Sequence, residues 1–333
     1  MRAACLFITL VLSTRALFTP SPDKPAAPKS MSPLVPKAYV AIVEPAALNL
    51  LEAIESVPVK VPTSLAPGGM VETTYAKFAC VGRLHKKAPL VLLHGFDSSS
   101  CEYRRLAPLL AEQGNRDVYV PDLFGWGFTQ PPAGCEDFGP EAKMEHLRCF
   151  IRQVCGSKPV VVVGASLGGA LAITLAADTP SMVEKLVLID AQGFIDGKGK
   201  SDIPIPLARL GVNVLKSSPL RMFANILAYK NKQLATLDAM RVGKLHCYTQ
   251  SWEDASVNFL RSGGFVVSDK VSRVAQEALL LWGRNDEILE PSTAERFVQT
   301  MPRCSLRWIE DCGHVPHLEQ PALTSRLVLE FLS

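Results

Sequence analysis

One segment constrains the fold more than any other: four consecutive valines lead directly into a glycine-rich turn and then into an apolar helix pattern. The valines are residues 160–163, the turn is 164–169 (GASLGG), and the helix pattern covers 167–177. An unbroken β-branched run is typical of a strand that is covered on both faces. The segment therefore predicts a buried strand, a sharp turn at Ser166, and a helix that packs back on the sheet.

The rest of the chain alternates in the same way, which predicts an α/β fold with a mainly parallel central sheet and helices on both faces. A long irregular stretch, about residues 193–273, interrupts the alternation, and we expect it to form an inserted helical lid. Strand patterns occur at 71–80, 90–93, 117–121, 160–163, 186–189, 278–282 and 306–309; helix patterns occur at 106–113, 138–154, 167–177, 293–300 and 321–331.

The N-terminal 69 residues differ in composition from the remainder. Residues 1–17 hold a short apolar run typical of a signal peptide, and residues 18–37 hold six prolines, three lysines and one acid, typical of a transit peptide. This order resembles the bipartite plastid presequences of algae with secondary plastids, so we expect import into a plastid; the alternative is a secreted or endomembrane protein. Residues 38–69 are predicted to be a linker with a short helix, and residues 70–333 the folded domain.

Composition limits the partners. The 333 residues carry a net charge of only +3, and no basic block is interleaved with aromatics, so we expect no nucleic-acid partner. We expect a small-molecule substrate, no metal ion and no organic cofactor. Peripheral contact with a membrane and the oligomeric state stay open.

The turn at Ser166 suits a nucleophile. Glycines at 164 and 168 leave room for a strained serine backbone, and the turn lifts the hydroxyl above the edge of the sheet. The helix that follows places its N-terminus beneath that hydroxyl. We therefore predict that the backbone N–H of Leu167 is one donor of an oxyanion hole.

The second motif is His94-Gly95-Phe96-Asp97, at the end of the strand that begins at 90. We predict that the Phe96 N–H is the second oxyanion donor and that its side chain lines the substrate pocket. His94 is expected to brace this loop. Asp97 is expected to cap the loop, and we assign it no chemistry.

A serine hydroxyl needs a base, and one of the six histidines is placed to act as one. His314 follows the last predicted strand, and the glycine before it lets the loop turn back over the sheet. Asp286 follows the preceding strand and is predicted to orient the imidazole of His314. Asp190, at the end of an earlier strand, is the fallback acid. The order Ser166, Asp286, His314 is that of the α/β-hydrolase fold.

With these motifs, residues 70–333 resemble the lidded branch of the α/β-hydrolase superfamily, which includes meta-cleavage-product hydrolases and epoxide hydrolases, and also resemble plastid α/β-hydrolases of plants and algae. A serine at the turn argues against epoxide hydrolases, which carry an aspartate there. Carbon–carbon hydrolases often have a tryptophan after the histidine, where this chain has Val315. The motifs say little about the substrate.

The resulting hypothesis is a serine hydrolase that cleaves an ester or thioester of a small, apolar substrate through an acyl-enzyme. Phe96, Trp252 and Val315 are the predicted substrate contacts. Two alternatives stay open: a small-molecule receptor of the same fold that does not turn over its ligand, and an acyltransferase.

Overall fold

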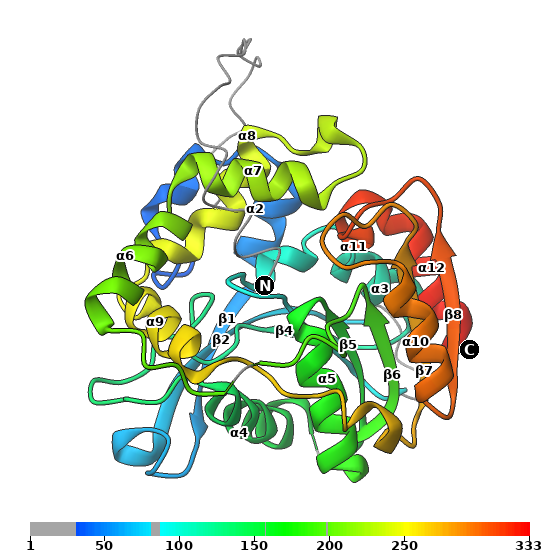
Figure 1. Cartoon of the computed structure of the whole chain (residues 1–333), viewed down its shortest axis with the longest axis horizontal. Helices are drawn as coiled ribbons and strands as arrows, with labels where there is room; N and C mark the ends of the chain where they lie inside the picture. Colours follow the sequence, from blue (N-terminus) through cyan, green and yellow to red (C-terminus); the bar gives the residue numbers. More distant parts are fainter. Residues whose placement is uncertain (1–30, 81–86, 157, 198) are drawn as a thin grey trace.

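The computed structural model describes residues 31–80, 87–156, 158–197 and 199–333. The predicted signal-like segment and most of the transit-like segment lie outside these residues. Figure 1 shows a single twisted sheet with helices on both of its faces and a group of helices above one edge. Within the described residues, no helix is long and apolar enough to cross a bilayer.

The sheet has eight strands in the order β1-β2-β4-β3-β5-β6-β7-β8. All pairs from β4 to β8 are parallel, and only the pairs β1–β2 and β2–β4 are antiparallel, which confirms the predicted mainly parallel sheet. The strands are β1 Ile54–Lys60, β2 Met70–Phe78, β3 Leu90–Leu93, β4 Val118–Pro121, β5 Val160–Ala165, β6 Val183–Ile189, β7 Glu277–Gly283 and β8 Cys304–Ile309.

The N-terminal part of the domain differs from the expected linker. A short helix, α2 (Pro45–Glu52), is followed by β1, which pairs antiparallel with β2 at the edge of the sheet. The proline at position 58 hides this strand in the sequence, because a proline cannot donate a ladder hydrogen bond. An edge strand tolerates it, since only one side of β1 is paired.

Each face of the sheet carries its own hydrophobic core. In β5 the side chains of Val160 and Val162 join one core, and those of Val161 and Val163 join the other. The first core contains residues of α4 (Pro140–Phe150), α5 (Leu167–Asp178) and α10 (Ser292–Thr300); the second contains residues of α2, α3 (Ala107–Gly114) and α12 (Pro321–Phe331). The valine run thus forms a strand covered on both faces, as predicted.

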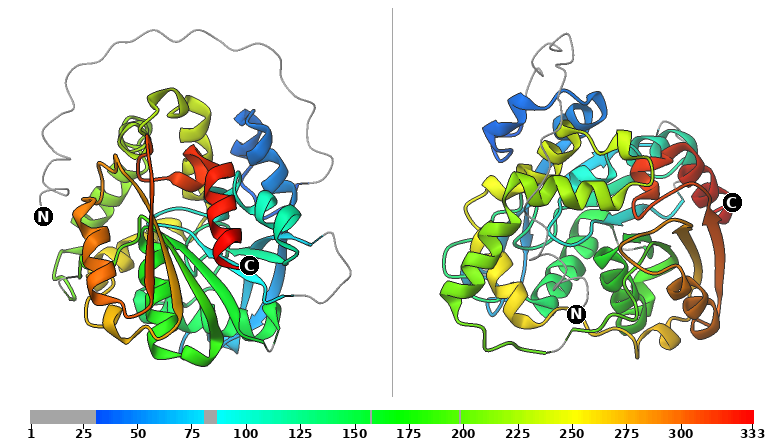
Figure 2. Two further views of the ribbon diagram at one scale, coloured as in Figure 1. Left: turned by 90° about the vertical axis from the view of Figure 1, so that its right-hand side faces the viewer. Right: turned by 45° about the horizontal axis from the view of Figure 1, so that its top comes forward.

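The stretch between β6 and β7 is helical, and we call residues 193–273 the insert. It contains α6 (Ile205–Leu215), α7 (Ser218–Ala228), α8 (Leu237–Lys244), η7 (Leu245–Tyr248) and α9 (Trp252–Ser262). Figures 1 and 2 show these helices grouped beside the sheet, with α7 and α8 next to each other. Residues of α7 and α8 border the same cavity as residues that follow β3, β5 and β8, so the insert faces the carboxyl edge of the parallel strands.

Candidate active site

Ser166 lies at a strained turn between β5 and α5. Its φ of 50° and ψ of −120° lie outside the regions that residues with side chains prefer, and such strain is common at functional sites. A side chain on Gly164 would clash with the carbonyl of Gly168, and one on Gly168 would clash with the carbonyl of Leu93. Close packing between strand, turn and helix therefore requires both glycines.

The helix after the turn places a free donor beside Ser166. Leu167 is the first residue of α5, and N–H groups in the first turn of a helix have no acceptor within it. Among the described residues, no carbonyl or side chain accepts a hydrogen bond from this N–H. The helix dipole adds partial positive charge at the same point, so an anion near the Ser166 hydroxyl would be stabilised.

The structure brings His314 and Asp286 together. The Nδ1 atom of His314 lies 2.7 Å from Oδ2 of Asp286, and both residues are buried. The other oxygen of Asp286 accepts hydrogen bonds from the N–H groups of Ile288 and Leu289, at 2.7 and 3.0 Å. Because these bonds fix the carboxylate, Asp286 holds the imidazole with Nδ1 occupied and leaves Nε2 for the cavity that Ser166 also lines.

A second acid stands beside this pair. Asp190 follows β6, and one of its carboxylate oxygens accepts the N–H of Gly283 at 2.9 Å. An oxygen of Asp190, an oxygen of Asp286 and a nitrogen of His314 all lie within 4.8 Å of one another. Burial, followed by the charge of Asp286, raises the pKa of Asp190 well above its usual value. This shift favours the neutral form of Asp190 over its carboxylate.

The loop after β3 contains a backbone N–H that has no acceptor among the described residues. The Gly95 N–H donates to Oε2 of Glu102 at 2.9 Å, whereas the Phe96 N–H has no acceptor among the described residues. The ring of His94 accepts the Leu123 N–H at Nε2 (3.1 Å), so Nδ1 carries the proton and donates to the Gly95 carbonyl at 3.0 Å. The prediction that His94 braces this loop is confirmed, and burial lowers its pKa.

A cavity of about 320 Å³ joins these groups, within the range of small-molecule sites. Ser166, His314, Phe96 and Val315 line it from the sheet side. The residue Phe96 is 47% exposed, and its ring packs edge-on against Trp126 with centroids 5.4 Å apart. The rest of the lining includes Ala224, Asn225 and Val242 of the insert, Ile288 after β7, and Leu318 of α11 (Pro316–Glu319).

Two expectations need correction here. Trp252, predicted as a substrate contact, is 1% exposed and is not among the residues lining the cavity, because its indole N–H donates to Oδ1 of Asp97 at 2.7 Å. Asp97 is not the expected cap of its own loop; within the described part of the chain, its carboxylate binds side chains of the insert instead. Sequence reasoning missed this arrangement because the partners of Asp97 are 124 to 155 positions away.

A family model described as the alpha/beta hydrolase family matches residues 90–327 of the chain. The chain belongs to this family. The alpha/beta hydrolase domain-containing protein VTE7 of Arabidopsis thaliana is 34% identical over 309 residues, which cover 90% of this chain and 89% of that protein. Lipase 1 of Psychrobacter immobilis is 27% identical, with 69% of this chain and 72% of the lipase covered.

A solved structure agrees on the fold. A serine hydrolase involved in carbazole degradation, the CarC enzyme, superimposes with a TM-score of 0.67 at 22% sequence identity. The match covers 84% of this chain and 99% of that one. The family and its named lipases and hydrolases support a hydrolase, and the α/β-hydrolase fold is established.

Proposed function

We propose that the chain is a serine hydrolase that cleaves an ester or thioester with an apolar acyl or alcohol group, with Ser166 as nucleophile, His314 as base and Asp286 as orienting acid. The observation that carries this proposal is the 2.7 Å bond between His314 and Asp286 at a cavity that also contains the strained Ser166. This is the set of roles required to activate a serine hydroxyl at neutral pH.

In the proposed reaction His314 takes the Ser166 proton at Nε2 as the hydroxyl oxygen attacks the carbonyl carbon. The charge on the carbonyl oxygen develops between the N–H groups of Phe96 and Leu167, both without an acceptor among the described residues. His314 then gives its proton to the leaving alcohol or thiol. Water, deprotonated by the same imidazole, attacks the acyl-enzyme, and His314 returns that proton to the Ser166 oxygen as the acid leaves.

The apolar part of the proposed substrate is inferred from the cavity walls. Phe96, Val242, Ile288 and Leu318 present hydrocarbon surface to the cavity, and the insert supplies part of it. The name of Lipase 1 supports an ester as the class of bond. Val315 lies beside His314 on the cavity wall, and we propose that it contacts the substrate together with Phe96.

Turnover of p-nitrophenyl esters of increasing acyl length tests this function. We expect hydrolysis that rises with chain length until the cavity is filled, and we expect Ser166→Ala to lower kcat by about a thousandfold or more. Product that shifts to a new ester when an alcohol or thiol is added would instead show an acyltransferase. Tight binding of an ester with at most one turnover would favour a receptor.

We also propose that the N-terminal 37 residues direct the protein to a plastid. The support is the order of signal-like and transit-like composition, together with the plant relative VTE7. A fluorescent protein fused to residues 1–37 is expected to enter the plastid of an alga with a secondary plastid. Retention in the endomembrane system or export to the medium would exclude plastid import.

A further inference from the structure

Asp97 is the centre of a buried polar cluster whose other described side chains come from the insert and not from its own loop. It follows Phe96 directly, its side chain is 7% exposed, and its φ of 48° is unusual for a residue with a side chain. Burying a carboxylate is costly unless charges and donors compensate it. The side chains that bind the Asp97 carboxylate in the described part of the chain all come from the insert.

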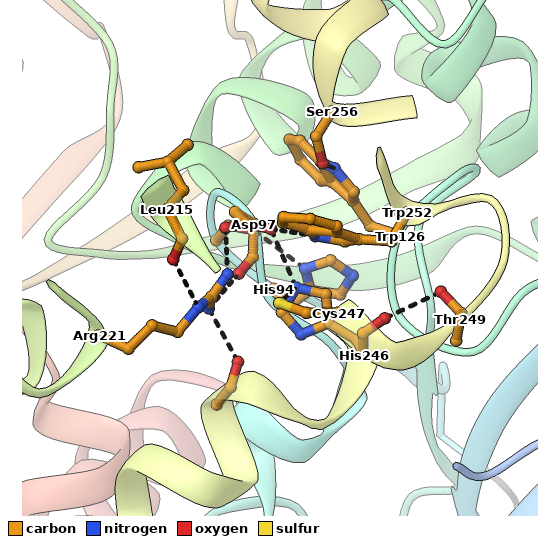
Figure 3. Close-up of polar contacts among 12 residues, drawn as sticks. His94, Asp97, Trp126, Leu215, Arg221, His246, Cys247, Thr249, Trp252 and Ser256 are labelled. Carbon is orange, nitrogen blue, oxygen red and sulfur yellow. Dashed lines mark hydrogen bonds and ion pairs between the residues drawn. The ribbon is translucent and has the colours of Figure 1, made fainter. Parts of the chain in front are cut away.

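Three insert side chains converge on this carboxylate, as Figure 3 shows. The Arg221 guanidinium of α7 forms an ion pair with Oδ2, and it also donates to the Asp97 backbone carbonyl at 3.4 Å. On the other side, Oδ1 accepts the Trp252 indole N–H at 2.7 Å and lies 3.0 Å from Nε2 of His246. Side chain and main chain of residue 97 are thus both held by the insert.

Arg221 connects the cluster to two helices. Its remaining donors bind the carbonyls of Leu215, at the end of α6, and Gly243, in α8, at 3.1 and 2.9 Å. Burial alone would raise the pKa of Asp97, but Arg221 and then His246 lower it below its usual value. Asp97 therefore stays ionised while the insert is docked, and displacement of Arg221 would leave a buried charge without its partner.

The cluster is not arranged as a metal site. Asp97, His246 and Cys247 do bring three ligand-type atoms within 4.8 Å of one another. However, both carboxylate oxygens already accept hydrogen bonds, and the guanidinium of Arg221 would repel a cation placed beside them. The arrangement instead favours a fixed connection between loop and insert.

We propose that Asp97 is a positioning residue through which the docked insert fixes the Phe96 N–H as an oxyanion donor, an inference that rests on the proposed function. The peptide of Phe96 adjoins a residue whose carboxylate and carbonyl both bind Arg221. Small errors in the position of such a donor lower the rate of the chemical step more than they weaken substrate binding. The insert therefore contributes to catalysis without touching the reacting atoms.

Asp97→Asn tests the proposal, because it keeps the size and the Oδ1 acceptor but removes the charge that holds Arg221. The matched control is Asp238→Asn in α8, whose carboxylate binds the backbone N–H groups of Val43 and Glu44. In Asp97→Asn we expect kcat to fall about tenfold to a hundredfold, with KM within about threefold. The control should keep both values.

Affinity for a trifluoromethyl ketone, which forms a tetrahedral adduct with a serine, is expected to fall in Asp97→Asn by the same factor as kcat. Titration with a fluorophosphonate counts intact active sites. A merely structural role would reduce that count and leave the ketone affinity of the remaining sites unchanged, and this result would overturn the proposal.

Hydrogen exchange provides a readout that needs no activity. In Asp97→Asn we expect faster exchange in peptides that cover residues 94–99 and 245–252, and in Asp238→Asn no change at 94–99. Unchanged exchange at 94–99 in Asp97→Asn would contradict the coupling itself. If the wild-type protein hydrolyses no ester and binds no ketone while exchange responds as expected, the proposed function fails and the connection between insert and loop stands.

Discussion

Two buried aspartates, Asp97 in the wall of the cavity around Ser166 and Asp286 in contact with His314, differ in how their charge is balanced. On one side Asp286 lies beside Asp190 and His314, and no arginine or lysine forms an ion pair with either acid among the described residues. On the other side the Asp97 carboxylate is neutralised by Arg221. A negative charge at Asp286 can stabilise an imidazolium that forms during a reaction. The charge of Asp97 is already paired with the permanent positive charge of Arg221.

The comparison indicates that two buried aspartates of one site can have different roles. In the proposed reaction the partner of Asp286 gains and loses a proton, so the interaction would strengthen as the transition state forms. At Asp97 the partner is a permanent cation, so the interaction is the same throughout the reaction. Its proposed role is only to position the Phe96 N–H. The same Asp→Asn substitution at each site should therefore have different consequences.

The largest effect is expected for Asp286→Asn. An amide at this position binds the wrong tautomer of His314, and we expect kcat to fall by about a thousandfold to ten-thousandfold with little change in KM. Steady-state kinetics on an activated ester measures both constants. A loss no larger than that of Asp97→Asn would mean that Asp286 only positions His314, and the contrast between the two acids would disappear.

The next largest effect is expected for Arg221→Gln, which should lower the free energy of unfolding because it leaves Asp97 buried without its cation. Removing one partner of a buried pair costs about 3–5 kcal/mol, and urea unfolding measures it. The matched control is Arg209→Gln, whose pair with Asp254 has side chains 50% and 66% exposed and should contribute less than about 1 kcal/mol. Equal losses in the two variants would show that the Asp97 pair is no more important than a surface pair.

The smallest effect on activity is expected for Asp190→Asn, which resembles the protonated acid. Because the folded protein raises the pKa of Asp190, the folded state binds this proton more tightly than the unfolded chain. Its stabilisation is therefore complete below about pH 4 and is lost as pH rises, by at most about 1.4 kcal/mol for each pH unit. Between about pH 4 and 8 the free energy of unfolding should therefore fall more steeply with pH in the wild type than in the variant, and the difference between the two slopes measures Asp190.

The effect of Asp190→Asn on kcat distinguishes Asp190 from Asp286. Asp190→Asn should keep kcat within about tenfold of the wild type, since the amide can still accept from Gly283 and donate toward Asp286. A loss as large as that of Asp286→Asn would instead assign the charged role to Asp190 or to the pair jointly.

The sheet and the candidate triad could be predicted from the sequence because their signals are local. The valine run of β5 and the glycines around Ser166 each lie within one short segment, and their steric reasons are visible in residue type alone. Asp286 follows a strand that is itself an apolar run, and His314 follows a strand in which polar and apolar residues alternate. Parallel strands bring their carboxyl ends to one edge, so the side chains that follow them meet.

The parts that could not be predicted depend on distant contacts. Asp97 and Trp252 are 155 positions apart, and nothing local to either residue indicates that they bind each other. The sequence alone therefore favours Trp252 as an apolar substrate contact, although its indole N–H needs a partner when buried. β1 escapes prediction for a different reason, since its proline and its mostly exposed side chains resemble a loop until β2 pairs with it.

The most direct test of the central claim is covalent labelling of the purified protein with a fluorophosphonate, with the adduct located by mass spectrometry. An activated serine beside a base and two free N–H donors should be labelled stoichiometrically at Ser166, and Ser166→Ala should not be labelled. A folded wild-type protein that remains unlabelled, or one that is labelled at another residue, would contradict the assignment of Ser166 as nucleophile.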